Sequence, residues 1–504
     1  MAGRVSYYGG ITTNGLIMDV DAAKLDSYVR TGTIWSDVSG NRNNGTLTNF
    51  GAQSTWNSGN GGAIVFDGTN DYVEFSDVPF RIPNYNFTCE FVFYFTGGSY
   101  TNHSVIGKRS SNAPYNQWSF GINNGDPYGG GTGKVLIAFL RDDNNPNSAS
   151  YDRVLTYTLP SEGIYHVILT NSQAQTQLWV NGAVRSTSTV SFYTGSFNIS
   201  GFNFRIGNYY TATYWNDKIY LSRFYNRTLT NTEVSQNINA MIFRFVPRVS
   251  DSDAQNFLNV TYTTNQTQAN AINYLVLGLK SFNLWTKMIA LYPFVGGNEY
   301  SHKFNLKDPR DLDAAFRLTF YGPWVHSTTG VLPNGSSTYC ETYLTPSTSM
   351  SINDCGISYY NRTSNAFSNF PNHGIIPTST NNRFYVSPQS THSAIIGTES
   401  ASFWIQYADS DKKGFYSDVR TATNSRTSYK NGVVKGTNTN NDTGGSLPSL
   451  TFQFGKANIQ FATATYTFDE LAIFVLHQGL TDTDAANFYT VVQNYNTILG
   501  RQVV

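Results

Sequence analysis

The chain has 504 residues, of which 40% are hydrophobic and only 13% are charged, where about 25% charged residues is typical. Its 33 basic and 33 acidic residues balance, which argues against a nucleic-acid binder with a basic face and against a polyacidic disordered chain. Aromatic residues reach 15%, and Gly, Asn, Ser and Thr are abundant, so strands and turns are favoured over helices. The composition predicts an all-β protein, and the length allows two large sandwiches or three smaller domains.

Neither a membrane segment nor a disulfide scaffold is expected. Residues 1–10 lack the apolar core of a signal peptide, and no apolar run reaches the roughly 18 residues of a membrane span. The cysteines are Cys89, Cys340 and Cys355, and three thiols cannot all pair within one chain. Reduced core or loop thiols are favoured, and a pairing of Cys340 with Cys355 stays open.

Alternating apolar residues and Asn-Gly pairs mark the strands in chain order. Residues 89–95 alternate, with one apolar face, as a half-buried strand does. Asn181-Gly182 and Asn431-Gly432 each separate two apolar runs. Both pairs predict tight hairpins, because both turn residues must accept a positive φ.

The same markers follow each hairpin in the same order. The gap from Asn181 to Asp217 is 36 residues, and the gap from Asn431 to Asp469 is 38. Upstream, Asp67-Gly68 with Tyr72 is echoed by Asn334-Gly335 with Tyr339. This shared order predicts two copies of one architecture.

Each copy is predicted to end in a strand and a capped helix. Thr230 with Glu233 forms a capping box, and Thr481 with Asp484 forms a weaker version. The helices are expected to run to about 241 and 496. Between the copies, residues 267–284 predict an amphipathic helix, whose apolar stripe packs on a sandwich rather than waiting for a partner. The stripe consists of Ile272, Leu275, Val276 and Leu279.

An ordered set of motifs identifies the first copy. Residues 15–22, 35–47, 66–73 and 219–234 resemble the laminin-G-like branch of the concanavalin A-like lectin/glucanase fold. The resemblance covers nearly all of residues 10–242. It implies a two-sheet antiparallel jelly roll of about 12–14 strands.

The second copy has a different resemblance. Residues 292–297, 302–306, 320–324 and 479–501 resemble segments of virion proteins of tailed bacteriophages, crAss-like phages above all. This resemblance implies a second lectin-like sandwich in a structural protein of the virion: a head fibre, a tail fibre or a capsid decoration. The implied partners are further copies of the chain as a homo-oligomer, other virion proteins and host-surface glycan.

The predicted fold is therefore two antiparallel β-sandwich jelly rolls joined by a short helical connector. The predicted organisation is a possible N-terminal anchor at 1–14, a laminin-G-like sandwich at 15–245, the connector at 246–288 and a second sandwich at 289–504.

No set of catalytic residues is found in the sequence. Lectin-fold glucanases carry paired acids on one strand, whereas Glu74, Glu90 and Glu162 are isolated here. Asp19 and Asp21 share a strand face but are interpreted as turn and edge hydrogen-bonding groups. The seven histidines lack metal-binding spacing, and no nucleophile or phosphate-loop motif occurs. No enzyme and no cofactor are expected.

Calcium is the one cofactor kept as an alternative, because many members of the lectin fold hold it at the sandwich rim. The oxygen-bearing candidates are Asp67, Asn70 and Asp71 in one cluster, and Asp142 and Asp143 beside two asparagines in another. Turn capping is the favoured role of both clusters, since no Asp-x-Asp-x-Asp-Gly loop is present.

Carbohydrate binding needs aromatic faces beside polar groups, because sugars have apolar C–H faces. The loop-placed candidates are Tyr128, Tyr151, Tyr209, Tyr210 and Trp215 in the first copy, and Trp324, His326 and Tyr343 in the second. A core or subunit-interface role is the alternative for each of them. Three functions follow in decreasing order: a virion structural protein, a glycan-binding adhesin and a glycan-degrading enzyme.

Overall fold

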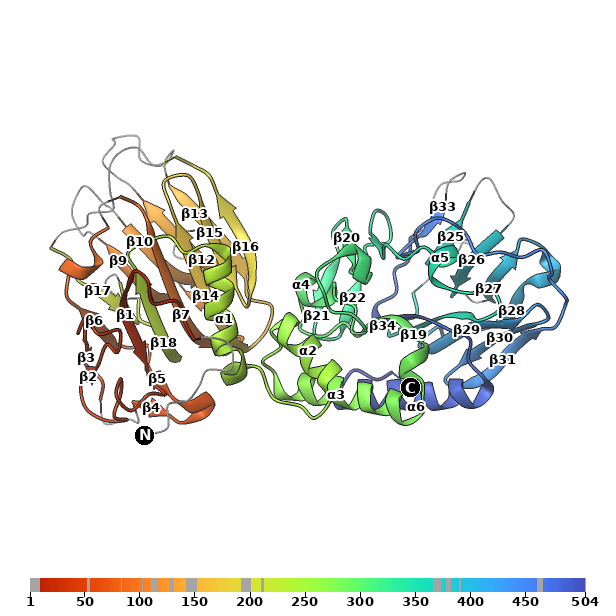
Figure 1. Cartoon of the computed structure of the whole chain (residues 1–504), viewed down its shortest axis with the longest axis horizontal. Coiled ribbons are helices and arrows are strands. Elements are labelled where there is room, and N and C mark those ends of the chain that lie inside the picture. The colour runs from red at the N-terminus through yellow and green to blue at the C-terminus, as the bar shows by residue number, and fades with distance from the viewer. Residues whose placement is uncertain are drawn as a thin grey trace. The chain divides into compact units, whose positions relative to one another are not determined.

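The computed structural model (Figure 1) divides into two compact units, Met1–Phe245 and Val246–Val504. It describes residues 10–51, 55–82, 84–101, 103–109, 117–126, 131–141, 152–191, 201–209, 213–365, 373–377, 382–388, 391–459 and 466–503.

The described strands of the first unit form two antiparallel eight-stranded sheets, called here the β7 sheet and the β10 sheet. The β7 sheet has the order β16 (Ala183–Ser188), β15 (Thr176–Val180), β14 (Gly163–Asn171), β7 (Phe87–Phe95), β18 (Lys218–Tyr225), β5 (Ala63–Val65) and β4 (Trp56–Asn57), with β1 (Leu16–Asp21) paired to β18. The β10 sheet has the order β13 (Arg153–Thr158), β12 (Val135–Arg141), β10 (Gln117–Asn123), β9 (His103–Arg109), β17 (Phe204–Ile206), β6 (Tyr72–Phe75), β3 (Gly45–Thr48) and β2 (Ile34–Trp35). A small ladder joins β8 (Tyr100–Thr101) and β11 (Thr132–Gly133).

The second unit repeats this plan in two further eight-stranded sheets, the β24 sheet and the β26 sheet. The β24 sheet has the order β21 (Val325–Ser327), β22 (Gly330–Leu332), β34 (Leu471–His477), β24 (Cys355–Asn361), β29 (Gly414–Ala422), β30 (Ser425–Lys430) and β31 (Val433–Asn438), with β19 (Met288–Tyr292) paired to β34. The β26 sheet has the order β20 (Thr319–Tyr321), β23 (Tyr339–Glu341), β32 (Gln453–Phe454), β25 (His373–Ile376), β26 (Asn382–Ser387), β27 (Thr391–Thr398) and β28 (Ile405–Ala408), with β33 (Ala457–Ile459) parallel to β25.

Aromatic side chains fill the space between the two sheets of each unit. The rings of Phe91 on β7 and Phe120 on β10 are 4.7 Å apart. In the second unit, Phe454 on β32 and Phe474 on β34 are also 4.7 Å apart. Burying such rings is the main stabilising contribution of each core. The predicted fold, two β-sandwiches of one architecture, is confirmed.

Both predicted hairpins are confirmed by their backbone angles. Asn181 and Gly182 have φ of 50° and 85°, and Asn431 and Gly432 have φ of 51° and 73°. Two successive positive φ values define the type I′ turn, whose twist matches that of the flanking strands.

Both closing helices begin with the predicted capping box. They are α1 (Asn231–Phe245) and α6 (Asp482–Ile498). The Glu233 amide donates to Thr230 Oγ1 at 3.3 Å, and the Thr230 amide donates to Glu233 Oε2 at 2.9 Å. Thr481 and Asp484 exchange the same two bonds at 3.1 Å each.

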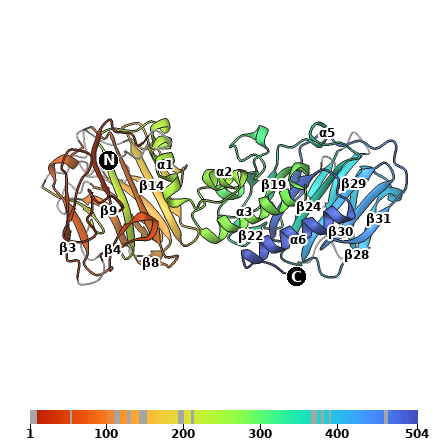
Figure 2. The ribbon, with the colours of Figure 1, turned by 60° about the horizontal axis from the view of Figure 1, so that its bottom comes forward.

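The predicted connector segment holds α2 (Ser252–Thr261) and α3 (Gln266–Ser281), and both belong to the second unit. Figure 2 shows α3 lying beside α6. A Cβ on Gly278 would meet Val491 Cγ1 of α6 at 2.9 Å, so glycine permits this close approach. The apolar stripe of α3 is fully buried, as predicted. Two single-turn helices, α4 (Glu299–His302) and α5 (Pro346–Ser349), complete the α-helices of the described residues.

The remaining expectations on cysteines, membrane spans and the N-terminus have separate outcomes. Cys89, Cys340 and Cys355 are all free and buried. Across the described residues, no helix is long and apolar enough to cross a membrane. Residues 1–9 of the predicted N-terminal segment lie outside the described residues.

Candidate functional site

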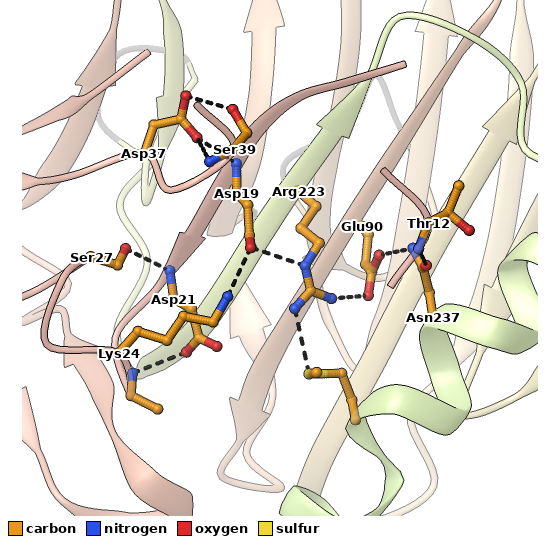
Figure 3. Close-up of polar contacts among 12 residues, drawn as sticks. Thr12, Asp19, Asp21, Lys24, Ser27, Asp37, Ser39, Glu90, Arg223 and Asn237 are labelled. Atoms are coloured by element: carbon orange, nitrogen blue, oxygen red, sulfur yellow. Dashed lines mark hydrogen bonds and ion pairs between the residues drawn. The ribbon is translucent and has the colours of Figure 1, made fainter. Parts of the chain in front are cut away.

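A buried ion network lies between the β7 sheet and helix α1 (Figure 3). Arg223 on β18 donates from Nε to Asp19 Oδ1 at 2.9 Å and from Nη1 to Glu90 Oε1 at 2.8 Å. His166 Nε2 lies 2.9 Å from the same Glu90 oxygen, and Asn237 of α1 donates to the other Glu90 oxygen at 2.7 Å. All five side chains are buried. The network therefore ties four strands, β1, β7, β14 and β18, to the closing helix.

The charge of Arg223 decides the state of Glu90. Burial alone would raise the pKa of Glu90, but Arg223 and the bond from His166 outweigh burial and hold this pKa at about 2. Glu90 is therefore an enclosed, ionised and fully partnered carboxylate. A group in this state cannot deliver a proton to a substrate near neutral pH.

The interpretation as turn and edge groups is wrong for Asp19, whereas Asp21 does accept a turn hydrogen bond from the Ala23 amide at 3.0 Å. Asp19 binds Arg223 and also Lys24 Nζ at 2.9 Å, while Asp21 binds Arg244 Nη1 at 2.7 Å. Glu90 is likewise not isolated. The reason is sequence distance: Arg223 follows Asp19 by 204 positions, and no local pattern shows such a pair.

The outer face of the β10 sheet carries amide and hydroxyl groups. Trp118, Phe120 and Ile122 of β10 point into the core, so the alternate side chains point outward. We define the β10 face as the outward residues around one hollow, Gln117, Ser119, Gly121, Asn123, Ile137, Phe139 and Tyr209. The hollow measures about 20 Å³, which is room for about one water molecule. It is a small polar hollow between strands, and six of its seven lining residues are buried.

Tyr209 lies at the mouth of this hollow. Its hydroxyl group forms hydrogen bonds with the hydroxyls of Ser104 and Ser119, and burial raises its pKa. The phenol is thus held in its protonated form. A Cβ on Gly121 would sit 3.2 Å from the Tyr209 oxygen, so the glycine leaves space for that oxygen. Gln117 Nε2 donates to Ser119 Oγ at 2.5 Å and completes a chain of polar groups across the face.

Among the other first-unit candidates, Trp215 is the one that lies within the described residues. Trp215 is 0% exposed, and its indole packs against Phe93 and Tyr100 in the core. Its selection as a loop-placed sugar contact is therefore wrong, because the loop turns the ring inward to fill the sandwich. Tyr128, Tyr151 and Tyr210 lie outside the described residues.

The side-chain oxygens of the first calcium candidates accept hydrogen bonds from backbone amides of their own turn. Asp67 Oδ1 accepts from the Thr69 amide at 2.7 Å, and Asp71 Oδ2 accepts from the Asp67 amide at 3.0 Å. Burial raises the pKa of Asp71 to about 6. One oxygen of each carboxylate thus accepts a backbone N–H group of the turn, as the turn-capping role predicts, while Asp71 Oδ1 has no hydrogen-bond partner among the described residues. Asp142 and Asp143 lie outside the described residues.

In the second unit, Trp324 and His326 are half-buried packing residues. Trp324 Nε1 donates to the Tyr321 carbonyl oxygen at 3.1 Å, and its ring meets Phe320 edge to face. His326 Nδ1 lies 3.0 Å from His302 Nδ1, and burial lowers the pKa of His326 to about 4. Neither ring presents an open face with polar groups beside it.

Tyr343 is the second-unit candidate that lies among other surface aromatics. Its hydroxyl bonds to Thr319 Oγ1 at 2.9 Å, and its neighbour Tyr321 is 42% exposed. Tyr321 and Tyr339 were not selected from the sequence. Alternation about the buried Cys340 is the signal that could have placed Tyr339 on the outer face.

Comparisons with known proteins agree with the first sandwich. Residues 67–235 match the family described as the concanavalin A-like lectin/glucanases superfamily. A search of curated proteins finds no match.

Solved structures show partial likeness. Domain 4 of a GH43 extracellular arabinanase from Geobacillus stearothermophilus, in complex with arabinotriose, is 16% identical, with a TM-score of 0.33 over 44% of this chain and 98% of that one. A Trypanosoma rangeli sialidase in complex with the inhibitor DANA is 16% identical, with a TM-score of 0.33 over 46% of this chain and 34% of the sialidase. An HCR/D mutant is 11% identical, with a TM-score of 0.34 over 92% and 93% of the two chains. The match therefore spans about a third of the sialidase. Within the first unit, residues 67–235 are therefore similar to the concanavalin A-like lectin/glucanases superfamily.

Proposed function

We propose that this chain is a non-enzymatic carbohydrate-binding protein whose first unit binds glycan across the β10 face. The observation that carries the proposal is the hollow in that face, which joins Gln117, Ser119 and Tyr209 on an outward sheet surface of a lectin-superfamily domain. Sugars offer hydroxyl groups and apolar C–H patches, and a site that binds them combines polar side chains with apolar surface.

The β10 face supplies both kinds of contact. Ser119 and Tyr209 each carry a hydroxyl group that can donate and accept, and Gln117 adds an amide. Ile137 and Phe139 of β12 line the same hollow with apolar surface. A pyranose ring laid across β10 and β12 would exchange hydrogen bonds with the first set and pack its C–H groups on the second.

Three carboxylates of the first unit, Asp19, Glu74 and Glu90, support binding without hydrolysis. Glycoside hydrolysis uses two carboxyl groups on either side of the scissile bond, one of them with a raised pKa. Glu90 is enclosed with a pKa of about 2, and Asp19 is bound by two cations. Glu74 is paired with Arg205 at 2.6 Å. None of these three is a free acid beside the β10 face.

The finer proposal places this binding on a phage particle, as part of a head fibre, a tail fibre or a capsid decoration. Its support is the resemblance of second-unit segments to virion proteins of tailed bacteriophages, together with the low charge of the chain. In this setting the chain would form a homo-oligomer and would also contact other virion proteins. The glycan that it binds would be on the host surface. Co-sedimentation of the purified chain with phage particles tests the placement, and a monomer that never joins particles contradicts it.

A glycan array with the full chain tests binding by the β10 face. We expect a defined set of glycans to bind in buffer containing either calcium or a chelator, and Gln117→Ala with Tyr209→Phe to weaken binding at least about tenfold, the effect of losing one or two hydrogen bonds. Thr48→Ala, on outer strand β3 of the same sheet, is the matched control. An array with no hit under either condition contradicts the proposal, as does a double variant that binds like the unmodified chain.

A further inference from the structure

We propose that the second unit carries a separate carbohydrate site, which takes a neutral pyranose sugar on a platform of three tyrosines. We define the tyrosine platform as Tyr321, Tyr339 and Tyr343. It lies on the outer face of the β26 sheet, outside the residues 67–235 matched by the lectin superfamily. The inference adds a second site to the proposed function and can hold even where the β10 face fails.

Two rings of the platform are stacked across neighbouring strands. Tyr321 on β20 and Tyr339 on β23 are register partners, and their ring centroids lie 4.6 Å apart with planes only 8° from parallel. Lys456 Nζ lies 3.9 Å from the Tyr339 ring centroid. Because β20 is the end strand of its sheet, the Tyr321 ring is at the margin of the stack. Its 42% exposure leaves an aromatic surface in contact with solvent.

The third ring is placed by an unusual backbone. Tyr343 has φ of +55°, a left-handed conformation that is unfavourable for a bulky side chain of this kind. Its amide donates to Glu341 Oε1 at 3.0 Å, which holds this turn. The turn brings the Tyr343 phenol beside Tyr321, and the charge of Tyr343 is the largest cause of the raised pKa of Tyr321. The strain therefore positions a ring on the platform.

An unused hydrogen-bond acceptor lies on the neighbouring strand β32, where Gln453 is the register partner of Glu341. Gln453 on β32 donates from Nε2 to Glu341 Oε2 at 2.9 Å. Its other amide atom, Oε1, has no hydrogen-bond partner among the described residues, although the side chain is only 8% exposed. An unpaired buried acceptor is unfavourable, and a ligand hydroxyl donating to it removes that cost.

These groups fit a neutral pyranose. Its C–H face packs on the exposed Tyr321 surface, while a hydroxyl donates to Gln453 Oε1. Both Glu341 oxygens are already hydrogen-bonded, so this carboxylate contributes negative charge rather than a contact, and it disfavours a sugar acid. Lys456 lies over the ring stack, so the surface has no large charge of either sign. A neutral sugar is therefore preferred over its acidic derivative.

The test uses the full chain and a panel of soluble probes: lactose, cellotriose and maltotriose as neutral sugars, and sialyllactose as the acidic comparison to lactose. Binding is measured by calorimetry and by NMR saturation transfer to each sugar. We expect at least one neutral probe to bind, and Tyr321→Ala to weaken it about five- to tenfold, the usual contribution of one aromatic contact. Gln453→Met should cause a similar loss, and sialyllactose should bind more weakly than lactose.

The controls separate this site from the β10 face. Val325→Ala changes another exposed side chain of the second unit and should leave binding unchanged. The double variant Gln117→Ala, Tyr209→Phe should still show saturation transfer to the sugar bound at the tyrosine platform. The Tyr321→Ala variant should lose this signal. The proposal is overturned when no neutral probe binds at 10 mM, or when a bound probe responds equally to Val325→Ala and Tyr321→Ala. Circular dichroism of each variant checks that the fold is retained, and a Tyr321→Phe variant, which keeps the ring, should keep most of the binding.

Discussion

On strand β6 of the first unit, Tyr72 and Glu74 point away from the core, and on strand β23 of the second unit Tyr339 and Glu341 hold the same places. The neighbouring strand supplies the partner of the carboxylate in both units. In the first unit this partner is Arg205, which pairs with Glu74 at 2.6 Å and covers the Tyr72 ring at 4.5 Å. Arg205 thereby both neutralises the Glu74 carboxylate and covers the Tyr72 ring.

In the second unit Gln453 takes the register position of that arginine. The glutamine donates only one hydrogen bond to Glu341 and leaves an oxygen unpartnered. Across the strand pair, Tyr321 stands opposite Tyr339 where Thr48 stands opposite Tyr72. The two units thus differ at two matching register positions: Gln453 stands in place of Arg205, and Tyr321 stands in place of Thr48. The first unit has a closed ion pair on this sheet face, and the second unit has an open aromatic surface on which we propose that a sugar binds.

A second contrast lies under the closing helices. The first unit buries charges, with Arg223 between Asp19 and Glu90. The second unit buries a neutral pair, in which Ser358 Oγ lies 2.7 Å from His477 Nε2. Burial lowers the pKa of His477 to about 4. The two units should therefore respond differently to acid and to loss of one partner.

Acid should destabilise the second unit at a higher pH than the first unit, and this is the largest effect we expect. Burial lowers the pKa of His326, His373 and His477 in the second unit to about 4, 3 and 4, from an ordinary 6.5. The unfolded chain binds protons there first, so stability is lost as pH falls from about 6.5 towards 4. Glu90 of the first unit has a pKa of about 2, so its contribution is lost only from about 4.5 downward.

Hydrogen exchange followed by mass spectrometry reads each unit through its own peptides across this pH range. We expect faster exchange of second-unit strands near pH 5, where first-unit strands stay protected. Asp71 and Asp469, with pKa values raised to about 6, act in the opposite direction, one in each unit. Their effects leave the comparison unchanged. Simultaneous loss of protection in both units would contradict this account.

Arg223→Met should destabilise the first unit by about 3–5 kcal/mol, because it leaves Asp19 and Glu90 buried without their shared cation. Arg205→Met is the matched control, since its ion pair is about one-third exposed and exposed pairs contribute about 0–1 kcal/mol. Urea denaturation monitored by first-unit peptides measures both. Equal effects of the two substitutions would show that the buried network does not hold the strands and helix together.

Gln453→Arg copies the first-unit arrangement into the second. The arginine should pair with Glu341 and remove the free acceptor, so the neutral sugar should bind about tenfold more weakly while stability is nearly unchanged. Calorimetry with the best neutral probe measures the change. If this variant binds the sugar as tightly as the unmodified chain, Gln453 does not contact the sugar.

Ser358→Ala should destabilise less than Arg223→Met, by about 1–3 kcal/mol, because it removes two neutral hydrogen bonds, to Ser417 Oγ and to His477 Nε2, and leaves His477 able to keep its bond to the Gln478 carbonyl at 2.6 Å. Urea denaturation of the second unit checks this value. A loss as large as that of Arg223→Met would mean that the neutral pair is as strongly coupled as the charged network.

Local patterns predicted the parts of the fold that depend on neighbours in sequence. Alternation gave strand 89–95, Asn-Gly pairs gave two hairpins, and Thr230 with Glu233 gave a helix start. The Arg223 network was missed because its members come from four strands and a helix far apart in the chain. Trp215 was misplaced because a loop can turn its ring inward. The tyrosine platform needed both the register of β20 with β23 and a positive φ at Tyr343, which only the folded chain shows.

A crystal of the full chain soaked with the best-bound neutral oligosaccharide tests the central claim most directly. We predict electron density for sugar across Gln117, Ser119 and Tyr209 of the β10 face, and a pyranose ring against Tyr321 with a hydroxyl within hydrogen-bonding distance of Gln453 Oε1. Well-ordered sugar elsewhere, with both faces bare, would contradict the account.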